Sequence, residues 1–415
     1  MEVKSWPEVY IPSIDSKNVF PQLSLYDSAS QKVQSLPAQT EYRMYVCGIT
    51  PYDSTHLGHA ATYISFDLIN RYLRASGSRV NYVQNITDID DPLLERAKRD
   101  GVDWQELAQS QVDLFRNDMT ALHVIPPKFY IGAVEAIPLV TEKIQELQSA
   151  QSIYSVDQDL YFRVHTDPDF GSRSHLSEEE QLKIFAERGG DPNRIGKDHP
   201  LDSLVWLSQR PDEPGWPSIY GQGRPGWHIE CCAIALKYLE PSSSSEYLID
   251  IQGGGSDLIF PHHEMSAAQA KVSTGRNFSR MYVHTGMIGL DGQKMSKSLG
   301  NLKFVSSLIQ SGANPMAIRC ALLMHNFSRD RMWDDQLLAK AATFIDDLTL
   351  HLSQTDCAPT QKVIQSIIQA LSSNLNTEEV FVILNQWIQD SKAGISGGHP
   401  GELSRALDAL LGIAI

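Results

Sequence analysis

The stretch Met44-Tyr-Val-Cys-Gly-Ile-Thr-Pro51 is an apolar run that ends in turn residues, and this pattern predicts a buried strand. Apolar residues then recur at three- and four-residue steps over 60–72, which predicts a helix that ends at Gly77. A second strand is predicted over 80–86. Strand, helix and strand in this order form a βαβ unit, which implies a parallel sheet. Such sheets bind their ligands at the carboxyl ends of the strands.

The segment 126–225 differs from its surroundings, because it is rich in Pro, Gly and Asp and carries turn signals such as Gly189-Gly-Asp-Pro192. Apolar strand patterns return at 247–251, and helical periodicity dominates after Asp334. We therefore expect an α/β fold with a Rossmann-like catalytic domain. The N-terminal half of this domain would span residues 1–125, and an insertion would follow over 126–225. The C-terminal half, with a lysine-containing loop, would span 226–333, and a separate helical bundle would span 334–415.

The composition excludes several classes of protein. The 415 residues are 42% hydrophobic, which is the share of a folded globular chain. A formal net charge of −15 argues against a surface that tracks a polyanion along its whole length. No apolar run reaches the roughly 18 residues of a membrane span, and no signal-peptide core is present at the start. Five sparse cysteines do not form a disulfide framework, so we expect a reduced, cytoplasmic compartment.

The tetrapeptide His56-Leu-Gly-His59 lies between the first predicted strand and its helix. The free N–H groups and the dipole of a helix N-terminus favour anions. Two histidines beside that end could donate hydrogen bonds to phosphate oxygens, and Gly58 would let a ligand approach the backbone closely. The alternative is one surface histidine and one helix-capping histidine.

The segment Lys294-Met-Ser-Lys297-Ser298 is flanked by glycines on both sides. A glycine-flanked loop with two lysines is suited to close on the charge that develops on a triphosphate. The alternative is an exposed basic turn, which is the commoner role of a lone Lys-x-x-Lys.

In this order on a βαβ framework, the two motifs resemble the signature pair of the class I aminoacyl-tRNA synthetases. Over most of its length the chain is similar to the cysteinyl-tRNA synthetase superfamily. The matching pieces are the residues 45–50, Gln84-Asn-Ile-Thr-Asp-Ile-Asp90, the residues 214–231, Gly253-Gly-Gly-Ser-Asp-Leu-Ile-Phe-Pro-His-His-Glu264 and the lysine loop.

The resemblance implies a zinc ion that holds the thiolate of the substrate cysteine, with Cys47, Cys231 and His262 as ligands. Three protein ligands leave one position open, as in catalytic zinc sites. The spacing alone does not join these residues, and without the resemblance Cys47 and Cys231 would be interpreted as buried free cysteines.

The resemblance also implies ATP as a substrate, with Mg²⁺, and places His56, His59, Lys294 and Lys297 around the triphosphate. Trp227 lies four residues before Cys231, so it could form a wall of the cysteine pocket; the alternative is a core tryptophan. Thr50 and Thr87 could bind the ammonium and carboxylate of cysteine or simply form turns, and Asp257 could accept from a ribose hydroxyl or cap a helix. The cysteine and nucleotide sites are predicted to comprise Cys47, Gly48, Ile49, Thr50, Thr62, Asn85, Ile86, Thr87, Trp227, Gly255, Ser256, Asp257 and Ile288.

Two departures from the synthetase pattern narrow the prediction. The synthetases have a further glutamate ligand four residues after the first histidine, where this chain has Ser266. The segment Glu187-Arg-Gly-Gly-Asp-Pro192 resembles a signature of the cysteine ligases of the mycothiol pathway, which join cysteine to an aminosugar–inositol. Residues 341–415 carry three Lys or Arg against eight Asp or Glu, which is a poor surface for an anticodon stem.

Together with the resemblance, these departures predict an ATP-dependent ligase that acts on small molecules: L-cysteine, ATP and glucosaminyl-inositol. The resemblance implies that the enzyme is a monomer. No tRNA and no membrane are expected as partners. A truncated cysteinyl-tRNA synthetase is the nearest alternative, because it would share the adenylate-forming step. A non-catalytic zinc–thiolate redox sensor, or a tRNA-binding regulator, built on a synthetase relic is an alternative from another class. Such a relic would have no physical reason to keep both phosphate motifs beside a complete pocket.

Overall fold

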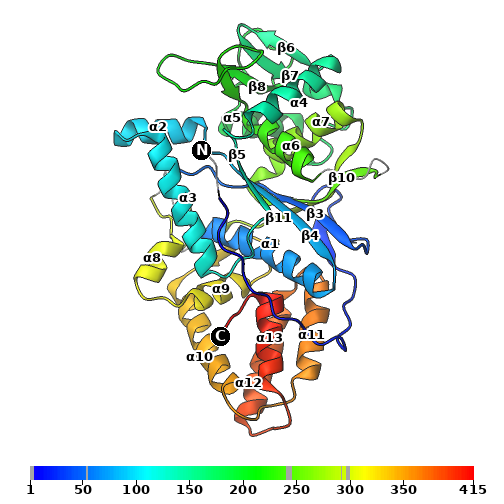
Figure 1. Ribbon diagram of the computed structural model, residues 1–415, viewed down its shortest axis with the longest axis vertical. Coiled ribbons are helices and arrows are strands. Elements are labelled where there is room, and N and C mark those ends of the chain that lie inside the picture. Colours follow the sequence, from blue (N-terminus) through cyan, green and yellow to red (C-terminus); the bar gives the residue numbers. More distant parts are fainter. Residues whose placement is uncertain (1–3, 53–54, 240–244, 291, 296–299) are drawn as a thin grey trace.

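The computed structural model describes residues 4–52, 55–239, 245–290, 292–295 and 300–415. A parallel sheet with the strand order β11-β10-β3-β4-β5 lies at the centre of the molecule (Figure 1). The predicted βαβ unit is confirmed, because β3 and β4 pair in parallel on either side of helix α1 in the chain. The strands are β3 (Glu41–Val46), β4 (Arg79–Ile86), β5 (Phe129–Gly132), β10 (Tyr247–Gly255) and β11 (Asn277–Thr285).

Strand β3 marks the switch point of this sheet. The chain continues from β3 to β4 on one side, while β10, which comes much later, pairs with β3 on the other side. The Cys47 N–H donates to the Gly253 carbonyl at 3.0 Å, so the ends of β3 and β10 lie together. Ligands of open α/β sheets bind at such a point.

The residues of β3 alternate between two cores, as the period of a strand requires. Met44 and Val46 pack in the core that contains α1 (Leu57–Ala75) and the C-terminal helices. Tyr45 and Cys47 face the opposite core, which contains α6 (Trp227–Tyr238) and α7 (Glu264–Thr274). Cys47 is therefore directed toward the helix that carries Cys231.

The inserted unit follows β5 and lies above the central sheet in the view of Figure 1. The predicted insertion starts at residue 126, but β5 within it belongs to the central sheet, so the chain leaves that sheet only after Gly132. The four-residue β5 comes soon after Pro126-Pro127, and a strand this short has no readable periodicity. The unit comprises α4 (Ile137–Ser149), α5 (Glu178–Glu187) and the antiparallel sheet of β6 (Ile153–Val156), β7 (Asp159–Phe162), β8 (Ser203–Ser208) and β9 (Gly223–Pro225).

A bundle of helices at the C-terminus covers the side of α1 that faces away from the sheet, at the lower end of Figure 1. The helices predicted after residue 334 are α10 (Asp335–Leu352), α11 (Gln361–Ser372), α12 (Thr377–Lys392) and α13 (Pro400–Leu411). No helix among the described residues is long and apolar enough to cross a membrane.

The remaining elements connect these parts. They are β1 (Ser24–Asp27), β2 (Lys32–Ser35), α2 (Asp91–Asp100), α3 (Trp104–Ala121), the short helices η1 (Val164–Thr166), η2 (Ser256–Leu258) and η3 (Ile259–His263), α8 (Val305–Gln310), α9 (Pro315–Leu323), and a small sheet of β12 (Ile288–Leu290), β13 (Gln293–Lys294) and β14 (Arg331–Trp333).

Candidate active site

Two thiols and an imidazole meet at the switch point of the sheet. Cys47 follows β3, Cys231 lies on α6, and His262 lies on η3. Their donor atoms all lie within 4.8 Å of one another, and all three residues are buried. The Sγ atoms of Cys47 and Cys231 are 3.9 Å apart, and His262 Nε2 is 3.2 Å from Cys231 Sγ. The structure thus brings together three residues that no sequence spacing connects.

This donor set fits a zinc ion. With Zn–S bonds of about 2.3 Å and Zn–N bonds of about 2.05 Å, tetrahedral coordination requires an S···S separation of about 3.8 Å and an S···N separation of about 3.6 Å. The observed distances of 3.9 and 3.2 Å need only small adjustments. Burial lowers the pKa of His262 well below its ordinary value, so the imidazole is neutral and has a lone pair to offer.

Two imidazole contacts support the cluster from behind. His228 Nδ1 lies 3.0 Å from His262 Nδ1, so the second nitrogen of His262 has a hydrogen-bond partner, as is usual for a metal ligand. On the other side, His263 Nε2 lies 3.2 Å from Cys47 Sγ, and its Nδ1 lies 2.7 Å from His284 Nε2. The series of contacts ends at Ser28, whose Oγ lies 2.7 Å from His284 Nδ1.

Sequence analysis did not predict the roles of these supporting residues. The only signals were the adjacency of His263 to His262 and the position of His284 near the carboxyl end of β11. Ser28 lies 256 residues from His284 in the chain, and nothing in a single sequence joins them.

Trp227, which the sequence predicts as a wall of the cysteine pocket, lies beside the cluster. Its ring stacks on that of His262, with the centroids 4.4 Å apart and the planes inclined by 26°. The residue is only partly buried.

The first phosphate motif lies at the start of α1, beside residues 303 and 304 that follow the lysine loop. His56 is the N-cap residue of this helix, and its side chain accepts from the His59 N–H. The Leu57 N–H donates to the Lys303 carbonyl at 2.9 Å, and His56 forms a backbone bridge with Phe304. The segment that follows the lysine loop is therefore anchored beside the predicted phosphate site.

The rings of His56 and His59 stack with centroids 3.7 Å apart. Burial lowers the pKa of His56 to about 4 and that of His59 well below its ordinary value, so both are neutral and can each donate one N–H. The backbone of Lys294 pairs with Gly289 in the small sheet, and Lys297 lies outside the described residues.

The predicted cysteine site includes a chain of polar contacts between β3 and β4. The Gly48 N–H donates to Asn85 Oδ1 at 2.8 Å, and Asn85 Nδ2 donates to Thr87 Oγ1 at 3.2 Å. Thr87 Oγ1 in turn donates to Glu230 Oε2 at 3.4 Å. A Cβ atom at residue 48 would lie 1.7 Å from the Asn85 carbonyl oxygen, so the close approach of the two strands requires glycine here.

The remaining predicted residues lie near the carboxyl ends of the central strands, except Ile288, which belongs to the small sheet. Ile49 accepts from the Thr87 N–H, and the Thr50 carbonyl accepts from the Tyr52 N–H. Thr62 on α1 contacts Thr285 at the end of β11, with 2.8 Å between the hydroxyl oxygens. Ile86 ends β4, Gly255 ends β10, Ser256 and Asp257 begin η2, and Ile288 begins β12.

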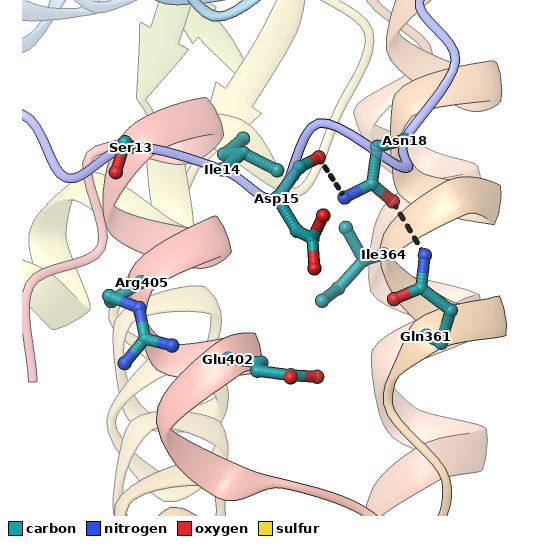
Figure 2. A pocket seen from close by; sticks show the side chains of 8 residues that line it. All are labelled: Ser13, Ile14, Asp15, Asn18, Gln361, Ile364, Glu402 and Arg405. Carbon is teal, nitrogen blue, oxygen red and sulfur yellow. Dashed lines mark hydrogen bonds between the residues drawn. The ribbon is translucent and has the colours of Figure 1, made fainter.

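A cavity of about 240 Å³ lies elsewhere, between the N-terminal segment and helices α11 and α13 (Figure 2). Asn18 crosses its wall, donating to the Asp15 carbonyl at 3.0 Å and accepting from Gln361 Nε2 at 3.0 Å. None of its lining residues belongs to the predicted cysteine, nucleotide or metal sites. This cavity is therefore separate from the candidate site at the switch point.

Comparison with known proteins gives three kinds of match. Residues 33–343 match the family described as tRNA synthetases class I (C) catalytic domain. The L-cysteine:1D-myo-inositol 2-amino-2-deoxy-alpha-D-glucopyranoside ligase of Thermomonospora curvata is 49% identical over 421 residues, covering 100% of both chains. The protein of that name from Gordonia bronchialis is 48% identical, again with 100% coverage of both chains.

Among solved structures, Mycobacterium tuberculosis methionyl-tRNA synthetase in complex with methionyl-adenylate is similar, with a TM-score of 0.62. The match covers 90% of each chain at 16% sequence identity, so it shows a shared fold and no more.

Proposed function

Since the chain belongs to the L-cysteine:1D-myo-inositol 2-amino-2-deoxy-alpha-D-glucopyranoside ligases, within the class I synthetase family, we propose that it ligates L-cysteine to glucosaminyl-inositol with ATP. The family resemblance that the sequence motifs predicted is confirmed. The observation that carries the proposal is the cluster of Cys47, Cys231 and His262 at the switch point, since thiolate and imidazole donors suit a thiol substrate held on a metal.

The reaction would proceed in two steps. The carboxylate of cysteine attacks the α-phosphorus of ATP, a new P–O bond forms, and pyrophosphate leaves. The unprotonated amine of the aminosugar then attacks the carbonyl carbon of the adenylate, the C–N bond forms, the amine loses a proton, and AMP leaves. Catalysis of both steps depends on positioning and on stabilisation of the developing charge.

Each group of residues has a role in this scheme. Cys47, Cys231 and His262 would hold the zinc ion, which when bound would fix the substrate thiolate. His56 and His59 would donate hydrogen bonds to phosphate oxygens, and Lys294 and Lys297 would offset the negative charge as pyrophosphate leaves. Trp227 and Thr87 would shape the cysteine site, while the turn of Gly255, Ser256 and Asp257 would contact the nucleotide.

A small acceptor explains the charge of the chain better than tRNA does. The net charge is −15, and residues 341–415 carry a balance of −5. A tRNA must be held by basic groups along its length, whereas an aminosugar needs only a pocket beside the adenylate. We expect a cytoplasmic, monomeric enzyme that does not depend on tRNA.

The deciding experiment supplies the acceptor after adenylate formation. The protein is incubated with cysteine and ATP, then with glucosaminyl-inositol or with cysteine tRNA at low salt, where phosphate binding is strongest. We expect the amide product, with a rate that rises as the amine deprotonates, and no charged tRNA. Charged tRNA without amide product would establish the truncated synthetase instead.

A further inference from the structure

Two arginines of the inserted unit hold the turn that carries His262. The turn runs from Ser256 to Glu264 and includes η2, η3 and the first residue of α7. Arg188 contacts its first part and Arg173 contacts its end, and both arginines come from the segment between β7 and β8. The segment 187–192, which the sequence singles out, contains Arg188, but the sequence predicted no contact of either arginine with this turn.

Arg188 satisfies backbone carbonyls where the turn is irregular. Phe260 has extended φ and ψ values of −139° and 138°, so the helical hydrogen-bond pattern is interrupted there. One guanidinium nitrogen of Arg188 donates to the carbonyls of both Asp257 and Phe260. Buried or partly buried carbonyls need such donors, and a guanidinium offers several in one plane. The side chain of Asp257 stays exposed and available to a nucleotide.

Arg173 fixes the other end of the turn through Glu264. Its guanidinium donates to Glu264 Oε1 at 2.7 Å, and the Ser174 N–H donates to Glu264 Oε2 at 2.8 Å. Glu264 is fully buried, so these charge-assisted bonds hold it firmly in place. His262 therefore lies between two points that the inserted unit fastens.

The signature segment 187–192 explains why Arg188 has a defined position. Gly189 has a positive φ of 84°, and a Cβ atom at Gly190 would lie 2.6 Å from the ring of Phe185. Asp191 accepts from Lys197 Nζ at 2.9 Å and from the Tyr161 hydroxyl. These residues make contacts within the inserted unit, whereas Arg188 reaches out of it to the turn.

We propose that Arg188 is a positioning residue, which sets the turn so that His262 faces the two thiols while Asp257 faces the nucleotide. This inference rests on the proposed function. It means that one side chain of the signature segment couples the metal site to the nucleotide site. The signature then serves adenylate formation, in addition to any part it has in lining the acceptor pocket.

The test compares Arg188→Met with a matched control, Arg194→Met. Arg194 lies six residues further along the chain and is also partly buried, but its hydrogen bonds go only to groups of the inserted unit, such as Asp159 Oδ2 at 2.6 Å and the Tyr161 hydroxyl at 2.8 Å. Each full-length protein is loaded with one equivalent of Co²⁺. We then measure the visible spectrum, the rate of metal transfer to a chelator, and the kinetics of cysteine-dependent ATP–pyrophosphate exchange.

Arg188→Met is expected to change the Co²⁺ spectrum and to speed metal transfer about 10- to 100-fold, which is the usual cost of losing a supporting contact. It should also raise the KM for ATP more than it lowers kcat. Arg194→Met should leave all three readouts near those of the unmodified protein. Arg188→Lys keeps the charge but not the planar donors, so its values should fall between.

Two results would overturn the proposal: unchanged metal transfer and KM in Arg188→Met, or equal losses in Arg188→Met and Arg194→Met, which would indicate general loosening of the inserted unit. If the Met variants do not fold, Arg188→Lys and Arg194→Lys decide by the same comparison. Absence of exchange in the unmodified protein would refute the proposed function alone, because metal transfer still tests Arg188. Absence of Co²⁺ binding in the unmodified protein would refute the metal site and this inference with it.

Discussion

Replacing Arg319 with methionine should destabilise the protein strongly without changing its affinity for cysteine. Arg319 lies on α9 and is fully buried. It pairs with Asp67 of α1 and donates to the carbonyls of Leu411 at 2.6 Å and Leu122 at 2.7 Å. This one side chain therefore joins α1, the end of α3 and the end of α13.

The expected loss in the free energy of unfolding follows from the groups that lose Arg319 as a partner. Asp67 is fully buried and would keep Arg71, whose Nε lies 2.7 Å from its carboxylate, so one of its two cationic partners remains. Two buried carbonyls would lose close, charge-assisted donors, at about 1–3 kcal/mol each. Breaking a buried ion pair from one side costs about 3–5 kcal/mol, and we expect a loss in this range.

The assay is equilibrium unfolding in urea, followed by circular dichroism, with Arg79→Met as the control. Arg79 pairs with Glu41 at 2.8 Å, but its side chain is 78% exposed, so the control should lose less than about 1 kcal/mol. A loss below about 1 kcal/mol in Arg319→Met, with native circular dichroism, would refute the reasoning. A raised KM for cysteine in the folded Arg319→Met variant would show that the contacts of Arg319 also affect the active site.

Three further predictions concern the site and its surroundings. Cys231→Ala should lose metal and cysteine activation together, and full adenylation by metal-free protein, measured by pyrophosphate exchange, would contradict the zinc assignment. Serine should support pyrophosphate exchange far less than cysteine, by well over the roughly 10–200-fold that pocket shape alone provides, because a thiol loses its proton and binds zinc as a thiolate much more readily than an alcohol does. A ratio under tenfold would exclude the metal as the selector. Burial raises the pKa of Asp118 to about 7, so its ionisation destabilises the fold as pH rises from about 4 to 7. At pH 4, Asp118→Asn should therefore have the same free energy of unfolding in urea as the unmodified protein. At pH 8 its free energy of unfolding should be higher by up to about 4 kcal/mol. Equal stability of the two proteins at both pH values would disprove this.

Local patterns were sufficient to predict the part of the fold that holds the site. The apolar run 44–49 and the periodicity over 60–72 predicted β3 and α1, because a strand and an amphipathic helix each leave their own period in the sequence. The short strand β5 was not predicted, because four residues after a proline pair carry too little pattern. Its place in the sheet is set by pairing with β4, which is a tertiary contact.

The spacing of residues in the sequence was not sufficient to predict the candidate site. Cys47 and Cys231 are separated by 184 positions, and only the family resemblance joined them before the structure did. Arg188 and His263 lie within motifs of the sequence, but those motifs do not indicate the contact of His263 with His284 or that of Arg188 with two backbone carbonyls. Backbone carbonyls are the same at every residue, so a sequence cannot indicate which of them needs a donor from elsewhere.

Ser266 occupies the position at which the synthetases have a further glutamate ligand. The sequence indicated only that a carboxylate ligand of the synthetase pattern is missing. In the structure Ser266 is buried and its hydroxyl donates to the His228 carbonyl at 3.0 Å, so it helps to fix the residue behind His262. The nearby carboxylate of Glu264 has both oxygens engaged by Arg173 and Ser174. Within the described part of the chain, the Cys47–Cys231–His262 cluster includes no carboxylate, so a zinc ion held by these three residues would keep one position open for a substrate thiolate.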